Sequence, residues 1–218
     1  LDWITATGSG SMTSAGASIP GTHYPKQGSW AMYAPGKVMV AGGLRAIDDG
    51  TVVNKAFTID LNGATPVVAS TAPMANARSF SNTVILPNGE VMVVGGNSSG
   101  QFFSDVGAVF TPEIWNPTTG QWRGVADLTI PRNYHSLAFL LPDGRVWSGG
   151  GGLSGDATTD HQDAQVFTPP QLFNADGSAA ARPVISVAPD RISPASVFIV
   201  NASSNVQYFS ADGMSSQT

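Results

Sequence analysis

The chain has 218 residues, of which only 11% are charged, and its formal net charge is −5. This balance excludes the clustered Lys and Arg that bind a nucleic-acid backbone, and it leaves no basic patch for a membrane surface. No apolar run approaches the roughly 20 residues that cross a bilayer, and the lack of cysteine excludes disulfide chemistry within the chain. We therefore expect no nucleic-acid partner and no membrane span. The richness in Gly, Ser, Thr and Asn favours a secreted, extracellular protein.

Short β-rich runs separated by turn residues predict an all-β architecture, since no long stretch has the 3.6-residue period of a helix. One pattern recurs three times: an apolar strand, a Pro-containing turn with Gly, a second apolar strand and a glycine pair. The pairs end at Gly43, Gly96 and Gly150, at intervals of 53 and 54 residues. This period is typical of the kelch repeat, in which each unit forms one four-stranded blade of a β-propeller. The alternative is a β-sandwich in which the glycines recur by coincidence.

Within the repeats, Asn88-Gly89 and Asp143-Gly144 predict two-residue hairpin turns, because Asn, Asp and Gly accept positive φ angles. Trp115 and Trp122 flank a further turn and belong to the kelch pattern. We expect both tryptophans to pack between neighbouring blades.

About three blades are predicted, whereas a propeller needs roughly 4 to 8. We assign residues 1–180 to the blades. Residues 181–218 lack the kelch pattern, and their short alternating strands and proline breaks predict the start of a small β-sandwich. The chain is therefore expected to be part of a larger protein.

The dipeptide Tyr134-His135 departs from the repeat. When the repeats are aligned on a shared arginine, the second repeat has Phe80-Ser81 at this place. The third repeat also has one more residue before its turn, which predicts a β-bulge in the strand. Adjacent strand residues point to opposite faces, so both side chains could reach one ligand only at such an irregularity or at the end of the strand. The alternative is a core tyrosine beside a surface histidine.

The stretch NYHSLAFLLPDGRVWSGGGG (residues 133–152), with VFTPEIW (109–115) and GSGSMTSAG (8–16), resembles the galactose oxidase family of copper-radical oxidases. The likeness extends over essentially the whole chain. It implies a seven-bladed kelch propeller followed by an immunoglobulin-like domain. Residues 1–180 would then hold about three of seven blades, and residues 181–218 the incomplete start of the immunoglobulin-like domain.

The resemblance also implies a copper site with two tyrosine and two histidine ligands, plus solvent or substrate. Tyr134 would be the axial ligand, which accepts the hydroxyl proton of the substrate, and His135 an equatorial ligand through a neutral imidazole nitrogen. In the family, one tyrosine is cross-linked to a cysteine and stores a radical. This Tyr-Cys cofactor is expected to lie outside the chain, before Leu1, and the remaining histidine ligand soon after Thr218.

The implied reaction is the oxidation of a primary alcohol or aldehyde by O2, which yields H2O2. Phe103 would lie on the aromatic wall beside the substrate, although ordinary packing is an equal alternative. Ile47 and Asp48 replace a Tyr-Gln pair near the substrate pocket of galactose oxidase. This difference weakens the case for galactose itself and leaves other primary alcohols, aryl alcohols or small aldehydes open. Without the remaining blades and ligands, the chain alone is expected to be inactive.

Two other histidines are expected to have structural roles. His161 lies between Asp160 and Asp163, in a segment that the resemblance makes mainly structural and at most a support for the ligands of the site. His23 lies in a Pro/Gly loop where a solvated or packing role is expected. Two other functions remain open. One is a non-catalytic kelch propeller that binds glycans or proteins, and the other is a structural or adhesion module.

Overall fold

The computed structural model describes residues 1–20, 23–46, 50–153, 155, 158–182, 184–193, 196–202, 206–210 and 213–216, with side chains up to residue 200. The chain divides into two compact units, Leu1–Pro169 and Pro170–Thr218. The sequence placed a division after residue 180, and the identity of the two units as propeller and immunoglobulin-like domains stays a prediction. Within the described ranges, no helix is both long and apolar enough to cross a bilayer.

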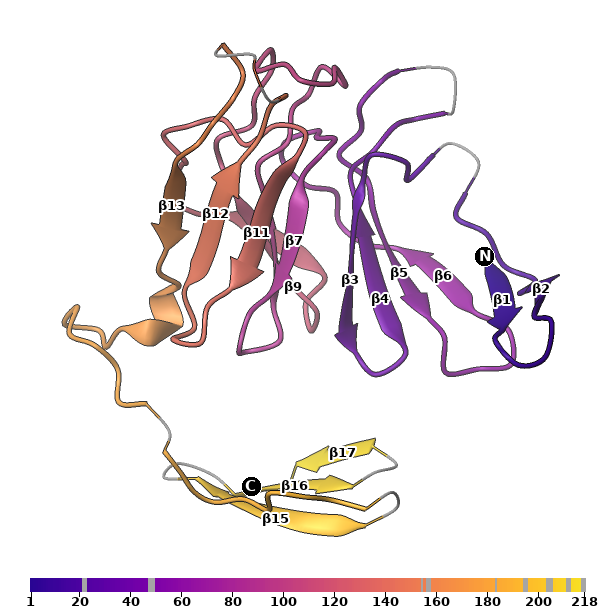
Figure 1. The fold of residues 1–218 in the computed structure, drawn as a ribbon, viewed down its shortest axis with the longest axis vertical. Coiled ribbons are helices and arrows are strands. Elements are labelled where there is room, and N and C mark those ends of the chain that lie inside the picture. Colours follow the sequence, from indigo (N-terminus) through magenta and orange to yellow (C-terminus); the bar gives the residue numbers. More distant parts are fainter. Residues whose placement is uncertain are drawn as a thin grey trace. The chain divides into compact units, whose positions relative to one another are not determined.

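The described part of the first unit contains a hairpin and three antiparallel sheets, in which strands pair in chain order (Figure 1). The hairpin joins β1 (Asp2–Thr5) to β2 (Ser11–Ser14). The first sheet contains β3 (Ser29–Ala34), β4 (Lys37–Ala41), β5 (Ala56–Asp60) and β6 (Val67–Ser70). The second contains β7 (Asn82–Ile85), β8 (Val91–Val94), β9 (Glu113–Asn116) and β10 (Gln121–Gly124). The third contains β11 (Ser136–Leu140), β12 (Val146–Gly150) and β13 (Ala164–Phe167). The all-β prediction is confirmed, with one sheet for each sequence repeat.

The hairpin turns of the second and third sheets are three residues long rather than two. The carbonyl oxygen of Leu86 accepts a hydrogen bond from the Gly89 N–H at 2.9 Å, and the Leu86 N–H donates to the Glu90 carbonyl at 2.8 Å. Gly89 takes a φ of 80°, as a three-residue loop requires at its last position. Leu141 and Gly144 repeat this arrangement in the third sheet. The predicted turn positions are therefore correct and the predicted length is wrong, because the preceding proline belongs to the loop.

Contacts between the first and second sheets involve both polar and apolar groups. Ser29 Oγ and Ser81 Oγ lie 3.1 Å apart, and Thr83 Oγ1 donates a hydrogen bond to the Trp30 carbonyl at 2.7 Å. A buried apolar cluster lies between the two sheets: Ala31, Met39, Ala41, Ala56, Met74, Val91, Val93 and Trp115. Burial of this surface is the main favourable contribution to the packing of one sheet on the next.

Trp115 and Trp122 pack between neighbouring sheets, as expected. Trp115 meets Tyr33 of the first sheet edge-on at a ring-centroid distance of 5.0 Å. Its indole N–H donates to Thr71 Oγ1 at 3.0 Å, and the Trp122 indole donates to the Ala72 carbonyl at 2.7 Å. Both indole donors are therefore satisfied across the boundary between the sheets, which permits their burial.

A second buried cluster joins the second sheet to the third. Its members are Val84, Leu86, Met92, Val94, Ile114, Leu128 and Val146. Asn82 Nδ2 adds a polar link, with a hydrogen bond to Ser136 Oγ at 3.0 Å. The first strands of the three sheets, β3, β7 and β11, thus lie next to one another in sequence order.

Arg78 and Arg132 occupy corresponding places in the second and third sheets, and both are 0% exposed. Each guanidinium donates to the carbonyl of a strand-ending glycine at 3.3 Å. Arg78 forms an ion pair with Glu113, and Arg132 forms one with Asp163 at 3.0 Å. Burial lowers the pKa of Arg78, and the Glu113 carboxylate acts in the opposite direction. The shared arginine of the repeats is therefore a buried structural cation.

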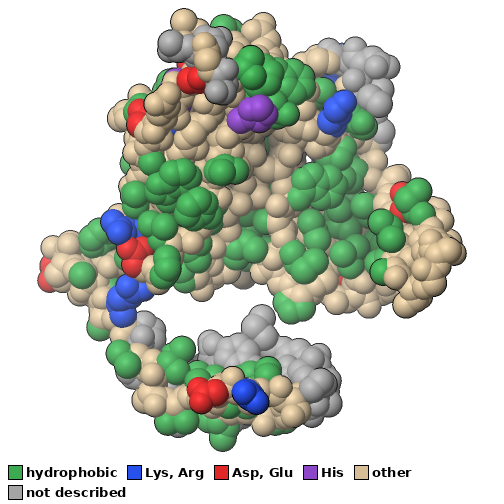
Figure 2. Space-filling model, in the orientation of Figure 1, with side chains coloured by type: hydrophobic (Ala, Val, Ile, Leu, Met, Phe, Trp, Pro, Cys, Tyr) green, Lys and Arg blue, Asp and Glu red, His purple; other side chains and the backbone are tan. Residues whose placement is uncertain are grey.

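The outer faces of the first and third sheets are apolar and exposed. Trp30 and Met32 alternate with the buried residues Ser29 and Ala31 of β3. On β11, the exposed Leu137 and Phe139 alternate with the buried Ser136 and the half-buried Ala138. Phe139 stacks on Trp147 at a centroid distance of 4.8 Å. Figure 2 shows hydrophobic side chains gathered over both sheets. We call these two surfaces the bare faces.

The second unit begins with the 3-10 helix η1 (Pro170–Leu172). Its described strands form one antiparallel sheet in chain order: β14 (Ile185–Val187), β15 (Val197–Ala202), β16 (Val206–Ser210) and β17 (Gly213–Ser216). This arrangement agrees with the predicted β-structure of residues 181–218.

Candidate metal and substrate site

Tyr134 and His135 form a turn immediately before β11, at the end of the third sheet where β12 finishes. His135 has a φ of 73°, in the left-handed region that non-glycine residues seldom adopt. The two rings consequently lie on the same side of the chain, with centroids 4.1 Å apart and planes inclined by 33°. The Tyr134 carbonyl accepts a hydrogen bond from the Gly152 N–H at 2.9 Å, which ties the turn to the glycine run.

The extra residue of the third repeat lies in this turn, and the predicted bulge in the strand is wrong. Leu86 lies five residues after the buried Ser81, and Leu141 lies five residues after the buried Ser136. Strands β7 and β11 both pair with their neighbours without a register shift. The insertion therefore falls between Arg132 and Ser136, and the turn rather than a bulge brings the two side chains together.

This placement also changes the correspondence between repeats. Phe80 has a φ of 59° and immediately precedes the buried Ser81, just as His135 precedes Ser136. Phe80 therefore corresponds to His135, and Tyr134 belongs to the lengthened turn. The second sheet has a shorter turn with an aromatic side chain and no metal-binding group at this place.

The His135 ring is oriented by its Nδ1 atom, which lies 3.1 Å from the carbonyl oxygen of Gly152. A carbonyl oxygen only accepts hydrogen bonds, so Nδ1 carries the proton in the neutral ring. Nε2 then has a free lone pair on an exposed side chain. A backbone carbonyl bound to the other ring nitrogen is the usual arrangement of a metal-binding histidine.

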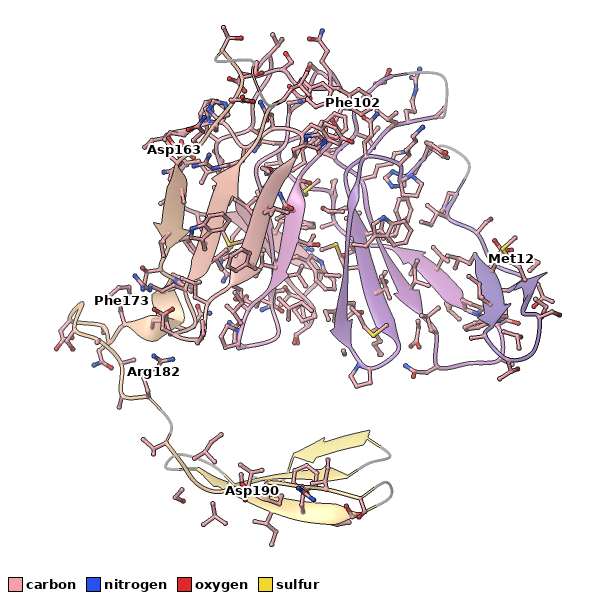
Figure 3. All side chains as sticks on the ribbon, viewed as in Figure 1. Met12, Phe102, Asp163, Phe173, Arg182 and Asp190 are labelled. Carbon is pink, nitrogen blue, oxygen red and sulfur yellow. The ribbon has the colours of Figure 1, made fainter. Side chains whose placement is uncertain are left out.

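Three phenylalanines surround the Tyr134 ring. Phe103 lies 5.2 Å from the rings of both Tyr134 and His135, in edge-on contacts. Phe80 and Phe102 each lie 5.0 Å from Tyr134. Phe102 is labelled in Figure 3, at the end of the unit where the loops gather. The structure thus brings Phe103 to Tyr134, and it adds two aromatic neighbours that the sequence did not assign.

A carboxylate from the second sheet's loop supports the turn. Asp105 accepts a hydrogen bond from Asn133 Nδ2 at 2.6 Å, and His161 Nε2 lies 3.0 Å from both Asp105 oxygens. Asn133 is 0% exposed and directly precedes Tyr134. Sequence reasoning missed Asp105 and Asn133, and the one available signal was the lengthened turn that contains Asn133.

The acidic segment around His161 is structural, as expected. Asp160 Oδ2 accepts the Gly155 N–H at 3.0 Å, Asp163 pairs with Arg132, and His161 contacts Asp105. Each side chain thus has a separate partner. Among the described residues, no three His, Cys, Asp or Glu side chains come together as a metal-binding group.

His23 has a packing role and is not solvated. Its ring is 4% exposed and lies 4.9 Å from the Phe57 ring. Burial, and secondarily the positive charge of Lys55, lowers the pKa of His23 to about 4. Ile47 and Asp48, which the sequence placed near the substrate, lie outside the described residues.

The donor set of the turn suits copper. Imidazole nitrogen is a good copper ligand, and Cu(II) prefers nitrogen and oxygen donors in a tetragonal arrangement. His135 offers an unprotonated Nε2, and Tyr134 offers a phenol oxygen on the adjacent residue. The two residues therefore fit part of a copper site.

Comparison with known proteins agrees with this chemistry. Residues 33–165 match the family model described as glyoxal oxidase N-terminus. Galactose oxidase from Gibberella zeae is 39% identical over 194 residues, which cover 85% of this chain and 28% of that protein. Aldehyde oxidase GLOX1 from Arabidopsis thaliana is 34% identical over 154 residues, which cover 65% of this chain and 25% of that protein. The chain thus spans about a quarter of the length of these curated relatives.

A solved structure extends the likeness to the fold. It is a fungal alcohol oxidase of the AA5 family in complex with copper, and it matches with a TM-score of 0.85 and 31% identity. The match covers 99% of this chain and 48% of the alcohol oxidase. Since the family model matches more than half of the sequence, the chain belongs to the galactose oxidase and glyoxal oxidase family of copper-radical oxidases.

Proposed function

We propose that this chain is part of a copper-radical oxidase that oxidises a primary alcohol or aldehyde with O2 to give H2O2, and that Tyr134 and His135 bind the copper. The observation that supports this most strongly is the hydrogen bond between His135 Nδ1 and the Gly152 carbonyl. With Nδ1 engaged by this carbonyl, Nε2 of the neutral ring is available to a metal, and the ring centroids of His135 and Tyr134 lie 4.1 Å apart. A core tyrosine beside a surface histidine needs no such orientation of the ring.

The residues of the chain have separate parts in the proposed reaction. Copper and the Tyr-Cys cofactor, when both are present, would each carry one of the two electrons that pass from the substrate to O2. Tyr134 takes the hydroxyl proton of the alcohol at its phenol oxygen. His135 holds its ring in one orientation through Gly152, and Phe103 forms a wall beside both rings. For an alcohol the balance is RCH2OH plus O2 giving RCHO plus H2O2.

The aromatic surroundings favour apolar substrates within this class. Phe80, Phe102 and Phe103 lie around Tyr134, and Phe102 is 49% exposed. Exposed aromatic rings beside a reactive oxygen offer apolar area to a substrate and few hydrogen-bonding groups for a sugar. We therefore propose aryl or aliphatic primary alcohols, or small aldehydes, as substrates.

The proposal includes the architecture of the whole protein. The three sheets are kelch propeller blades, and the second unit is the start of an immunoglobulin-like domain. The two bare faces support further blades, because each has the apolar, alternating pattern that is buried between the described sheets. The Tyr-Cys cofactor and the other histidine ligand belong to those other parts. The 218 residues alone are then inactive, and the whole protein is secreted.

The test uses the complete gene product loaded with Cu(II) and examined by electron paramagnetic resonance. Tyr134→Phe and His135→Ala should each change the copper signal and abolish H2O2 production from benzyl alcohol. Tyr33→Phe, which removes the hydroxyl of a half-buried tyrosine beside Trp115, is the matched control and should behave as the wild type. An unchanged copper signal in both site variants would contradict the site. Copper-independent glycan or protein binding without H2O2 production would favour a binding module instead.

A further inference from the structure

We infer that Asp105 is a positioning residue for the proposed site, which fixes the Tyr134-His135 turn and the Phe102-Phe103 wall relative to each other. The inference rests on the proposed function, since it gives these groups their roles as ligands and substrate wall. Asp105 itself contacts neither Tyr134 nor His135 in any described hydrogen bond, so it acts through other residues.

The first connection runs through Asn133. Its Nδ2 donates to Asp105 Oδ1 at 2.6 Å and lies 3.4 Å from the Thr159 carbonyl. A charge-assisted hydrogen bond of this kind is stronger than one between neutral groups. Because Asn133 is fully buried and covalently joined to Tyr134, the position of its side chain fixes the start of the turn.

The second connection runs through His161 and the glycine run. Both oxygens of Asp105 lie 3.0 Å from His161 Nε2, and the backbone N–H of His161 donates to the Gly151 carbonyl at 3.0 Å. Gly151 precedes Gly152, the residue whose carbonyl orients the His135 ring. One carboxylate thus supports the turn from both sides.

Close packing explains why the glycine run accompanies this network. A Cβ atom on Gly151 would lie 2.6 Å from Asn133 Oδ1, and the residue has a φ of 120°. Only glycine leaves room there for the buried amide side chain. The glycine run and Asn133 are therefore parts of one arrangement.

The third connection is the loop of Asp105 itself. Phe102 and Phe103 precede it by three and two residues, and the Ala108 N–H donates to the Asp105 carbonyl at 3.0 Å. Asp105 comes from the loop between β8 and β9, whereas Asn133 and His161 come from loops that flank strands of the third sheet. The carboxylate therefore joins the aromatic wall of one sheet to the ligand turn of the next.

The experiment compares Asp105→Ala and Asp105→Asn with Asp127→Ala in the complete gene product. Asp127 accepts a hydrogen bond from Thr111 Oγ1 at 2.6 Å on the exposed surface, so its loss serves as a matched control. Asp105→Ala should lower the affinity for Cu(II) about tenfold, as the loss of supporting hydrogen bonds does at other metal sites, and should alter the resonance signal. Asp105→Asn, which keeps one acceptor oxygen, should fall between Asp105→Ala and wild type, and Asp127→Ala should match wild type.

A measurement on copper-free protein separates this inference from the proposed function. A long-range 1H–15N spectrum resolves the histidine rings, and His135→Ala identifies the His135 signal. In wild type, that signal should show the tautomer with the proton on Nδ1, and in Asp105→Ala it should show an average of both tautomers. An unchanged His135 ring in both Asp105 variants would overturn the inference. If the ring responds but His135→Ala leaves the copper signal unchanged, the positioning stands and the copper site fails.

Discussion

His135 Nδ1 lies 3.1 Å from the carbonyl oxygen of Gly152, and this contact decides which ring nitrogen of His135 can bind a cation. The carbonyl belongs to the last residue of a four-glycine run, where φ is 102°. The conformation of the glycine run and the chemistry of the histidine are therefore linked, and this link can be tested by substitution.

Gly152→Ala should disturb both stability and copper binding. A Cβ atom there would lie 2.2 Å from the Thr159 carbonyl oxygen, so the backbone must shift and the carbonyl that orients His135 moves with it. We expect a loss of about 2 kcal/mol in the free energy of unfolding and a weaker Cu(II) signal. Gly155→Ala is the control, because Gly155 has a φ of 93° and nothing within 4 Å of the added atom. If urea unfolding showed equal losses of stability for the two substitutions, backbone strain alone would explain the loss, and the clash of the Gly152 Cβ atom with Thr159 would not contribute.

Phe103→Ala should raise KM for aryl alcohols more than for small ones. The ring of Phe103 contacts Tyr134 and His135, and an aromatic pair of this kind is worth about 1 kcal/mol beyond burial. Since the same ring can make such a contact with an aryl substrate, we expect KM for benzyl alcohol to rise about fivefold, with a smaller change for ethanol. Phe110→Ala removes a partly exposed ring outside the aromatic group and should leave both KM values unchanged. Equal changes for the two alcohols would argue against a substrate wall at Phe103.

The stability of the protein should fall as pH decreases from about 6.5 to about 4, partly because of His23. Its pKa is about 4 in the folded protein and 6.5 when unperturbed, so the unfolded chain binds more protons in this range. The difference corresponds to at most about 3 kcal/mol. His23→Leu should remove this part of the pH dependence in urea unfolding at a series of pH values. An identical slope for variant and wild type would mean that His23 binds the same number of protons in the folded and the unfolded protein, which would contradict the prediction.

Glu113→Ala should destabilise the fold strongly. It would leave the Arg78 guanidinium buried without its anion, and would also remove the acceptor of the Ala75 N–H at 2.6 Å. Breaking a buried ion pair from one side costs about 3 to 5 kcal/mol. The exposed pair of Lys37 and Asp60, 3.6 Å apart, provides the comparison. Lys37→Ala should cost less than about 1 kcal/mol in the same thermal or urea unfolding experiment.

The sheets could be predicted from the sequence because their signals are local. Glycine pairs and Pro-Asn-Gly or Pro-Asp-Gly turns lie within a few residues of the strands that they limit. The length of each turn was missed, because it depends on whether Leu86 pairs with Glu90, which a residue pattern does not reveal. The resemblance to a family, rather than the residue pattern, identified Tyr134 and His135, and their role as metal ligands stays a prediction.

The supporting residues of the site could not be predicted in this way. Asp105 meets Asn133 from 28 residues away and His161 from 56 residues away, in loops without a repeating pattern. Similarly, two aligned repeats show that a residue has been added but not where the backbone accommodates it. Only the paired registers of β7 and β11 place the addition in the turn before Ser136.

The bare faces have a consequence for the behaviour of the 218 residues in solution. Trp30 and Met32 lie on the side of the first sheet away from the second sheet, and Leu137 and Phe139 lie on the side of the third sheet away from it. If these two unlike surfaces bind each other, copies of the 218 residues would join head to tail, and each added copy would present a fresh surface to the next. Assemblies of this kind grow longer as the protein concentration rises, until their curvature closes a ring. The particle size measured by light scattering should therefore decrease on dilution.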